Sequence, residues 1–443
     1  MRTTFTPAKP RHGRVLPAWL AALPLGACAF DAVETKGWTF TPGLELRFGL
    51  QYGEGINFGL GALDDGDDDR TSASLSLEPA LTIEHAALDG TAHATVSVVA
   101  ASNALDGEVS GQFANAGDSR IDIDRAHVGW RNERFEIALG PQVFSVGDGL
   151  VLADGNFDVG ASEGQFWVGP FDAWKNAAVL KWNGEKLRGD VFWLRSGGGF
   201  GDARLYGANV ENVAAPWGRW GAMVLDLYQG DALAYDGVLA TNLRALDVPV
   251  PGIAGLKLYG EVVVQRGRDD DHGGVANRGL GWYLEAGYTL PALPWTTILT
   301  YRYSHFSGDD PATAANESYR SMFYGFYLRE WDTFYQGEIA GEYHLFNTNQ
   351  VTQFVKLRTF ASARVAFTLY YFQHDLEERN YYGAALASRD WADEINAGVE
   401  YFLDQRAYVY AGIAWSSPNA AAREAFGGSQ DFTVVQTWMS FHF

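Results

Sequence analysis

Long runs in which apolar and polar residues alternate constrain this chain more than any other feature of its sequence. In one such run, Leu44, Leu46 and Phe48 alternate with Glu45 and Arg47. A period of two residues places one apolar face and one polar face on a β-strand. Many runs are as long as the roughly 9–11 residues that a tilted transmembrane strand needs. Further examples are 256–265 and 394–401.

The composition favours a membrane barrel over a soluble protein. Aromatic residues make up 14% of the chain and hydrophobic residues 47%, yet the mean hydropathy is only -0.14. Outside the N-terminal segment, no apolar run approaches the ~20 residues of a membrane helix. We therefore expect an all-β fold, a transmembrane antiparallel β-barrel with long extracellular loops.

Residues 1–29 have the pattern of a cleaved signal peptide. Four basic residues precede a short apolar stretch at 15–26, and Ala27-Cys28-Ala29 is a small-residue cleavage site. A competing interpretation is a lipobox at 25–28, which would make Cys28 a lipidated N-terminus. Both interpretations predict export beyond the inner membrane, with residues 30–443 forming one outer-membrane domain.

Short and long connections alternate along the chain, which predicts the number of strands. Bacterial barrels have short periplasmic turns, long extracellular loops and an even strand count. If every long connection lies outside, the count is about 18. This requires 306–350 to be one long loop, which we expect to act as a lid or plug. The predicted strands begin near residues 40, 72, 91, 119, 134, 174, 187, 203, 219, 235, 255, 279, 295, 351, 363, 391, 406 and 430.

The C-terminus resembles the terminal-strand signal that the barrel-assembly machinery reads in outer-membrane proteins. Phe443 is terminal and aromatic, and Phe441, Met439, Thr437 and Val435 alternate before it. We therefore expect the assembly machinery to be a partner through Phe443.

Charged residues on the polar faces of the strands are the candidate pore lining. A charge facing lipid costs roughly 2–4 kcal/mol at the membrane midplane, so these side chains should point inward. There, fixed charges set the ion preference of a pore. The alternative is that each cation only braces the wall by pairing with one of Glu45, Glu136, Glu261, Glu285, Glu394 or Glu400. The ten basic residues are Arg47, Arg125, Arg131, Lys181, Arg188, Lys257, Arg302, Lys356, Arg358 and Arg364.

The net charge of -21 excludes nucleic acid as a partner, because phosphate binding needs a basic surface. Acidic runs at 64–69 and 269–272 are either solvated loop tips or cation sites next to outer-membrane lipid and lipopolysaccharide. The first run lacks the glutamate that completes an EF-hand loop.

Two motifs typical of enzymes and cofactor sites are missing from the sequence. There is no H-E-x-x-H and no phosphate-binding loop. The single cysteine, Cys28, lies in the export segment, so disulfides and cysteine-based metal sites are excluded. We expect neither catalytic residues, nor a cofactor, nor a metal site.

Several short segments between about 140 and 350 resemble alginate-export-type outer-membrane porins. They are 139–144 with 147–150, then 202–207, 301–303 with 307–311, and 336–339 with 347–349. The resemblance implies a monomeric 18-stranded barrel whose arginine- and lysine-lined constriction passes an acidic polysaccharide, with 329–338 as the lid. One departure is Pro141, where that family has a basic residue, and it weakens the expectation of alginate as the substrate.

Two hypotheses of different classes follow. The first is an outer-membrane pore for passive passage of a polar, anionic solute or polysaccharide. The second is a structural or adhesion barrel whose acidic loops bind a surface partner, with no open pore. An outer-membrane hydrolase is a third, weaker hypothesis, because no Ser/His/Asn trio is apparent.

Overall fold

The computed structural model describes residues 30–112, 116–153, 155, 173–197, 202–213, 215–230, 237–269, 274–293, 295–325, 336–403 and 406–443. The predicted signal peptide lies outside these residues. So do 270–272 of the second acidic run, most of the predicted lid at 329–338, and the predicted turn at 404–405.

The alternating runs form one antiparallel sheet of 20 strands. Two of these, β1 (Val33–Thr35) and β13 (Val275–Asn277), are three-residue additions to its edge and loops, which leaves 18 barrel strands. These are β2 (Trp38–Glu54), β3 (Asp69–Ala87), β4 (Gly90–Leu105), β5 (Ser119–Arg131), β6 (Phe135–Leu139), β7 (Asn176–Asn183), β8 (Leu187–Arg195), β9 (Arg204–Asn212), β10 (Arg219–Gln229), β11 (Val238–Pro249), β12 (Leu256–Asp269), β14 (Leu280–Leu290), β15 (Thr296–Phe306), β16 (Gln350–Ser362), β17 (Val365–Leu376), β20 (Asp390–Phe402), β21 (Ala407–Pro418) and β22 (Phe432–His442).

The predicted fold and strand count are confirmed. Each predicted strand start lies within three residues of the observed one, with the largest differences at residue 72 against Asp69 and 235 against Val238. β15 and β16 are paired neighbours, with Phe306 opposite Gln350, as expected if one long loop joins them.

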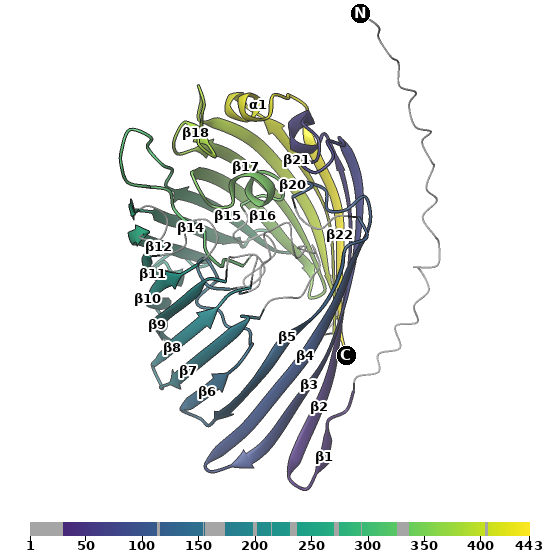
Figure 1. Cartoon of the computed structure of the whole chain (residues 1–443), viewed down its shortest axis with the longest axis vertical. Helices are drawn as coiled ribbons and strands as arrows, with labels where there is room; N and C mark the ends of the chain where they lie inside the picture. The colour runs from purple at the N-terminus through teal and green to yellow at the C-terminus, as the bar shows by residue number, and fades with distance from the viewer. Residues whose placement is uncertain are drawn as a thin grey trace, which may run out of the picture.

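The sheet closes because β2 pairs with β22 as well as with β3 (Figure 1). Leu46 lies opposite Phe441 on one side and Leu77 on the other. Beyond the last paired residues, the N–H of Phe443 donates to the carbonyl of Leu44 at 2.9 Å, and the N–H of Leu44 donates back at 3.1 Å. Closure removes the unpaired strand edges that a bilayer cannot accommodate.

On barrel strands such as β3, the polar side chains are buried and the apolar side chains are exposed, which is the opposite of a soluble protein. On β3, Ser74, Ser76 and Glu78 point inward and are at most 3% exposed. Leu75 and Leu77 point outward and are 50% and 38% exposed. The outward apolar band is what lipid would cover, and the inward polar face is covered by loops that fold into the barrel.

The wall is uneven in height. β3 has 19 residues and β4 has 16, whereas β6 has only five. Figure 1 shows β2 to β5 as long, strongly tilted strands and β6 to β9 as short ones on the other side. The loop that follows β6 consequently leaves the wall low in the barrel.

Helical segments are short and lie in the loops. They are η2 (Ile56–Gly59), η4 (Ala340–Leu345) and α1 (Ala420–Phe426); a two-stranded hairpin, β18 (Asn380–Tyr381) and β19 (Ala384–Ala385), also lies in a loop. Among the described residues, none of the helices is long and apolar enough to cross a membrane.

Candidate pore and its charged wall

The loop between β6 and β7 turns into the barrel at Gly140. Gly140 has a φ of 112°, where only glycine is comfortable, and a side chain there would collide with the carbonyl of Ala126. The next residue, Pro141, accepts a hydrogen bond from the N–H of Ala126 at 2.9 Å. Proline fits this position because it has no N–H to leave unpaired where the chain departs from the sheet.

Beyond this point, the described part of the loop packs against the inner wall. Its apolar residues, including Val151 and Leu152, form one core cluster with the inward side chains Phe192, Leu205 and Leu225. The inner face of β8 to β12 is therefore apolar toward the loop end and polar toward the turn end, where Asp190 and its neighbours lie. Simple alternation does not predict this division, because it depends on which part of the wall the loop covers.

A second inward segment meets the first inside the barrel. Leu152 and Phe323 form a parallel bridge, and the N–H of Ala153 donates to the carbonyl of Phe323 at 2.7 Å. The N–H of Gly325 donates to the carbonyl of Gly149 at 3.0 Å. The loops that follow β6 and β15 thus join each other and narrow the lumen.

The returning part of the 306–350 loop is fastened to the opposite wall. Glu394 on β20 is fully buried. Its carboxylate accepts hydrogen bonds from the N–H of Ile339 at 3.1 Å and from the N–H of Ala340 at 2.8 Å. Glu338 accepts hydrogen bonds from Tyr410 at 3.3 Å and from Gln436. These buried bonds hold the segment at 336–349 against the inner wall of the barrel.

His344 lies at the centre of this fastening. Its Nε2 is 3.2 Å from the side-chain oxygen of Asn57, and its ring packs against Phe58 and Phe426. Burial, together with the nearby His374, lowers the pKa of His344 from 6.5 to about 3. The imidazole is therefore neutral in the packed loop at physiological pH.

Most of the ten candidate basic residues lie beside a carboxylate on the same strand, on a neighbouring strand or on the next strand but one. Arg302 and Arg358 are the most deeply buried of the ion-paired ones, with nitrogen–oxygen distances of 2.6 Å to their partners. The pairs are Arg47 with Glu45, Arg125 with Glu78, Arg131 with Glu84, Lys181 with Glu136, Arg188 with Glu211, Lys257 with Asp247, Arg302 with Glu285, and Arg358 with Glu400.

Arg302, Lys356 and Arg358 share one stretch of wall, because β15 and β16 are paired neighbours. The guanidinium of Arg302 lies between the rings of Tyr283 and Phe354, at 4.9 and 4.8 Å. The ammonium of Lys356 is 5.9 Å from the ring of Tyr370 on β17. Aromatic faces stabilise buried cations here in addition to carboxylates.

Arg125 points inward because of a β-bulge. The pairing of β4 with β5 shifts between Val96 and Val98, so that Asp124 and Arg125 together lie opposite Ser97. The N–H of Arg125 donates to the hydroxyl of Ser97 at 3.1 Å. Arg125 keeps 32% of its side chain exposed, so its guanidinium remains accessible from the lumen while it pairs with Glu78.

One placement expected from the sequence is wrong. Arg364 was expected on a strand, but it lies exposed in the two-residue turn between β16 and β17. β16 ends at Ser362, whose hydroxyl accepts the N–H of Arg364 at 3.1 Å and fixes the turn. Arg131 lies at the last residue of β5, where its side chain is 47% exposed.

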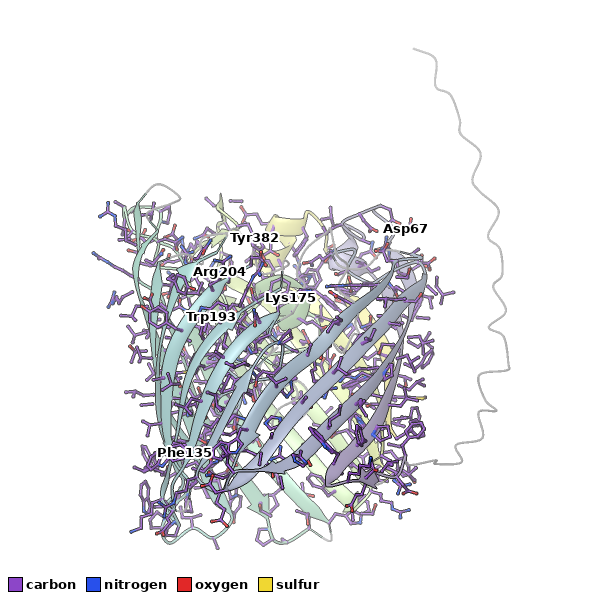
Figure 2. The ribbon with its side chains drawn as sticks, turned by 60° about the horizontal axis from the view of Figure 1, so that its bottom comes forward. Asp67, Phe135, Lys175, Trp193, Arg204 and Tyr382 are labelled. Carbon is purple, nitrogen blue, oxygen red and sulfur yellow. The ribbon has the colours of Figure 1, made fainter. Side chains whose placement is uncertain are left out.

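Several cations of the inner wall were not among the candidates. Arg244 on β11 shares Glu211 with Arg188, at 2.8 and 2.7 Å. Lys175 and Arg120 share Asp122, at 2.8 and 3.0 Å. The alternation of 238–249 contained the signal for Arg244. Lys175 precedes its strand, so no pattern identified it; Figure 2 shows it near the loop end of the barrel.

The acidic run at 64–69 has a partner within the protein. The guanidinium of Arg70 lies 2.5 Å from Asp64 and 2.7 Å from Asp65. Asp67 lies at the outer, loop end of the barrel, and Phe135 at the turn end (Figure 2). Within the described residues, no three His, Cys, Asp or Glu side chains group as metal ligands.

Comparison with known proteins identifies the architecture. No protein-family model and no curated protein matches the chain. Solved structures do: Pseudomonas aeruginosa OccK2 (OpdF) has 14% identity and a TM-score of 0.58 over 91% of this chain and 97% of its own. OpdL and OccK5 (OpdH) of the same organism each have 11% identity over 91% of this chain and 98% of theirs, with TM-scores of 0.57 and 0.56.

At such low identity these likenesses establish the fold alone. That fold, a closed 18-stranded barrel with an apolar outer band, agrees with what the strand register and burial show independently. Closed barrels are the only sheets that can span a bilayer, because they leave no strand edge unpaired. The chain is an integral outer-membrane β-barrel protein with a porin-type fold.

Proposed function

We propose that the chain is a passive pore for polar, anionic solutes, a class that includes acidic polysaccharides of the alginate type. The observation that carries the proposal is the sharing of single carboxylates by two cations on the inner wall. Glu211 serves both Arg188 and Arg244, and Asp122 serves both Arg120 and Lys175. Each of these groups has more positive than negative side chains.

The more exposed cation of each group is available to a solute. Arg188 keeps 38% of its side chain exposed and Lys175 keeps 41%, whereas Arg244 keeps 2%. A fixed positive field inside a narrow, low-dielectric passage attracts anions and repels cations. The inward loops, which join at Leu152 and Phe323, favour solutes small or thin enough to pass between them and the wall.

Ion selectivity in a planar bilayer tests the proposal. We expect a reversal potential in a salt gradient that reports anion preference, and we expect Arg188→Gln to reduce it. Arg134→Gln, in an exposed turn outside the strands, is the matched control and should leave selectivity unchanged. A folded protein with no conductance would favour the alternative, an adhesion barrel whose inward loops close it.

Substrate size is a separate measurement. Adding short acidic oligosaccharides should block the current transiently if an acidic polysaccharide is the substrate. Blocking by small carboxylates alone would retain the anionic pore and exclude the polysaccharide.

A further inference from the structure

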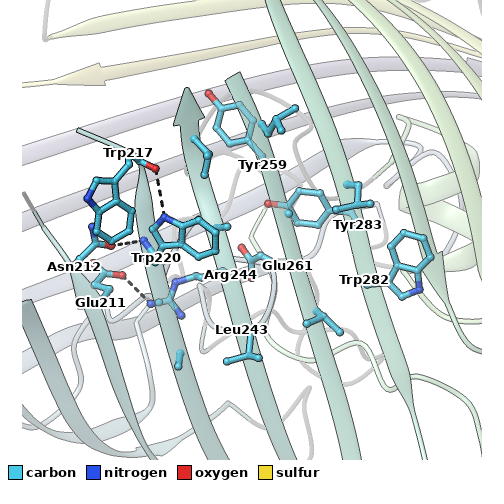
Figure 3. A pocket seen from close by; sticks show the side chains of 18 of the residues that line it. Glu211, Asn212, Trp217, Trp220, Leu243, Arg244, Tyr259, Glu261, Trp282 and Tyr283 are labelled. Carbon is cyan, nitrogen blue, oxygen red and sulfur yellow. Dashed lines mark hydrogen bonds and ion pairs between the residues drawn. The ribbon is translucent and has the colours of Figure 1, made fainter. Parts of the chain in front are cut away.

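A groove of about 950 Å³ lies on the outer wall over β8 to β14. The outward side chains along it, including Val210, Leu243, Leu258 and Leu284, are 42–63% exposed. The inward residues of the same strands, such as Arg244, contribute little open surface because they are buried. The groove therefore belongs to the face that lipid covers. Figure 3 shows Trp217 and Trp220 on one side of it and Trp282 on the other.

The groove exists because its floor is made of small residues. Ala245 and Gly260 lie directly opposite each other on β11 and β12, on the outward face. Gly260 lies opposite Leu284 on β14, whose Cδ2 is 3.0 Å from where a Cβ on Gly260 would be. Leu243 stands two residues from Ala245 on the same face. Large side chains thus flank a floor formed by a methyl group and a glycine.

The position of the groove within the membrane limits its occupant. Trp217 lies in the short connection between β9 and β10, and Leu187 is the first residue of β8 after another short turn. Short turns mark the periplasmic end of such barrels. Tryptophan favours the boundary between acyl chains and headgroups. The exposed Lys186, next to Leu187 in the turn, places a positive charge at this end.

We propose that this groove is a binding site for one phospholipid of the periplasmic leaflet. Its acyl chain would lie over Ala245 and Gly260 between the flanking leucines, continuous with the lipid-facing band. Its phosphate would lie near Lys186, beside Trp217 and Trp220. The groove removes acyl methylenes from contact with mobile lipid and fills a recess that would otherwise be poorly packed.

Native mass spectrometry of the full chain, extracted from outer membranes in polymer nanodiscs, tests this site. We expect the wild-type protein to retain one phospholipid. Ala245→Leu fills the floor, and each methylene it displaces should weaken retention about fourfold. The control is Ala411→Leu, an outward alanine of β21 paired with Val399 and Thr437. It should retain phospholipid like the wild type.

Two further measurements keep the outcome decisive. If Ala245→Leu does not form a heat-modifiable barrel, Gly260→Ala makes a smaller change in the same floor and should still reduce retention. Lys186→Gln should reduce retention of anionic phospholipids more than that of zwitterionic ones. Equal retention by the floor variants and Ala411→Leu overturns the site. Two other results would show that the occupant is not a phospholipid. One is that the wild type retains lipopolysaccharide in the groove. The other is that the wild type retains a second copy of the chain and Ala245→Leu does not.

Discussion

The carboxylate of Glu394 accepts a hydrogen bond from the backbone N–H of Ala340 at 2.8 Å, although 54 residues separate the two in the chain. The N–H of Ile339 binds the same carboxylate at 3.1 Å. This carboxylate is one of the points at which the barrel wall fixes the returning segment of the inward loop, 336–349. Its removal is the most direct way to ask whether that loop limits passage.

Glu394→Ala should release the inward loop and raise the single-channel conductance. The substitution leaves two buried N–H groups without acceptors, at a cost of roughly 1–3 kcal/mol each. Glu394→Gln keeps an acceptor oxygen and should change conductance far less. Planar-bilayer recording of both variants makes the comparison, and identical conductance in Glu394→Ala and wild type would show that this anchor does not limit the pore.

Acid should loosen the same loop through His344. Its pKa is about 3 in the packed loop and 6.5 when released, so packing is fully stabilised above about pH 6.5 and loses stability as the pH falls toward 3. Burial raises the pKa of Glu108, and hydrogen bonds from Ser110 oppose this shift. The contribution of Glu108 to the stability of the packed loop therefore weakens as the pH rises, which is the opposite of the effect of His344. We expect conductance to increase between pH 7 and pH 4 in the wild type and to change less in His344→Gln. The same increase in both would assign the effect to other groups.

Replacing Lys356 and Arg358 together with Gln should lower the preference of the pore for anions. The structure adds a complication, because Arg358 lies 2.6 Å from the buried Glu400. Breaking one side of a buried pair costs roughly 3–5 kcal/mol, so the double variant should also unfold more readily in urea. Adding Glu400→Gln should recover much of that stability. An unchanged reversal potential in the folded triple variant would mean that these cations only brace the wall.

Phe443 has two separable roles. Its backbone exchanges two hydrogen bonds with Leu44 at the seam of the barrel, and its ring is the expected signal for the assembly machinery. Deleting Phe443 removes both, whereas Phe443→Ala keeps the backbone bonds. We expect both variants to show less heat-modifiable barrel in outer membranes. Normal assembly of Phe443→Ala with failure of the deletion would assign the defect to closure of the seam.

The sequence by itself determined the strands and their number. A strand between lipid and a polar interior must alternate, and loops of unequal length reveal which end of the barrel each connection occupies. These are local consequences of the period of a β-strand. They located β22 and β16 within two residues and kept 306–350 as one loop.

Only the tertiary structure decided what each inward side chain meets. Ile121 and Ile123 face outward, and strict alternation along β5 would place Arg125 on the same outward face. A bulge opposite Ser97 turns Arg125 inward instead. Arg188 and Arg244 lie on strands separated by two others in the barrel wall, β9 and β10, yet converge on Glu211. Register shifts, cross-strand pairing and the path of inward loops depend on contacts between residues far apart in the chain. No local period encodes such contacts, so the sequence could propose which charged residues point inward but not which of them pair.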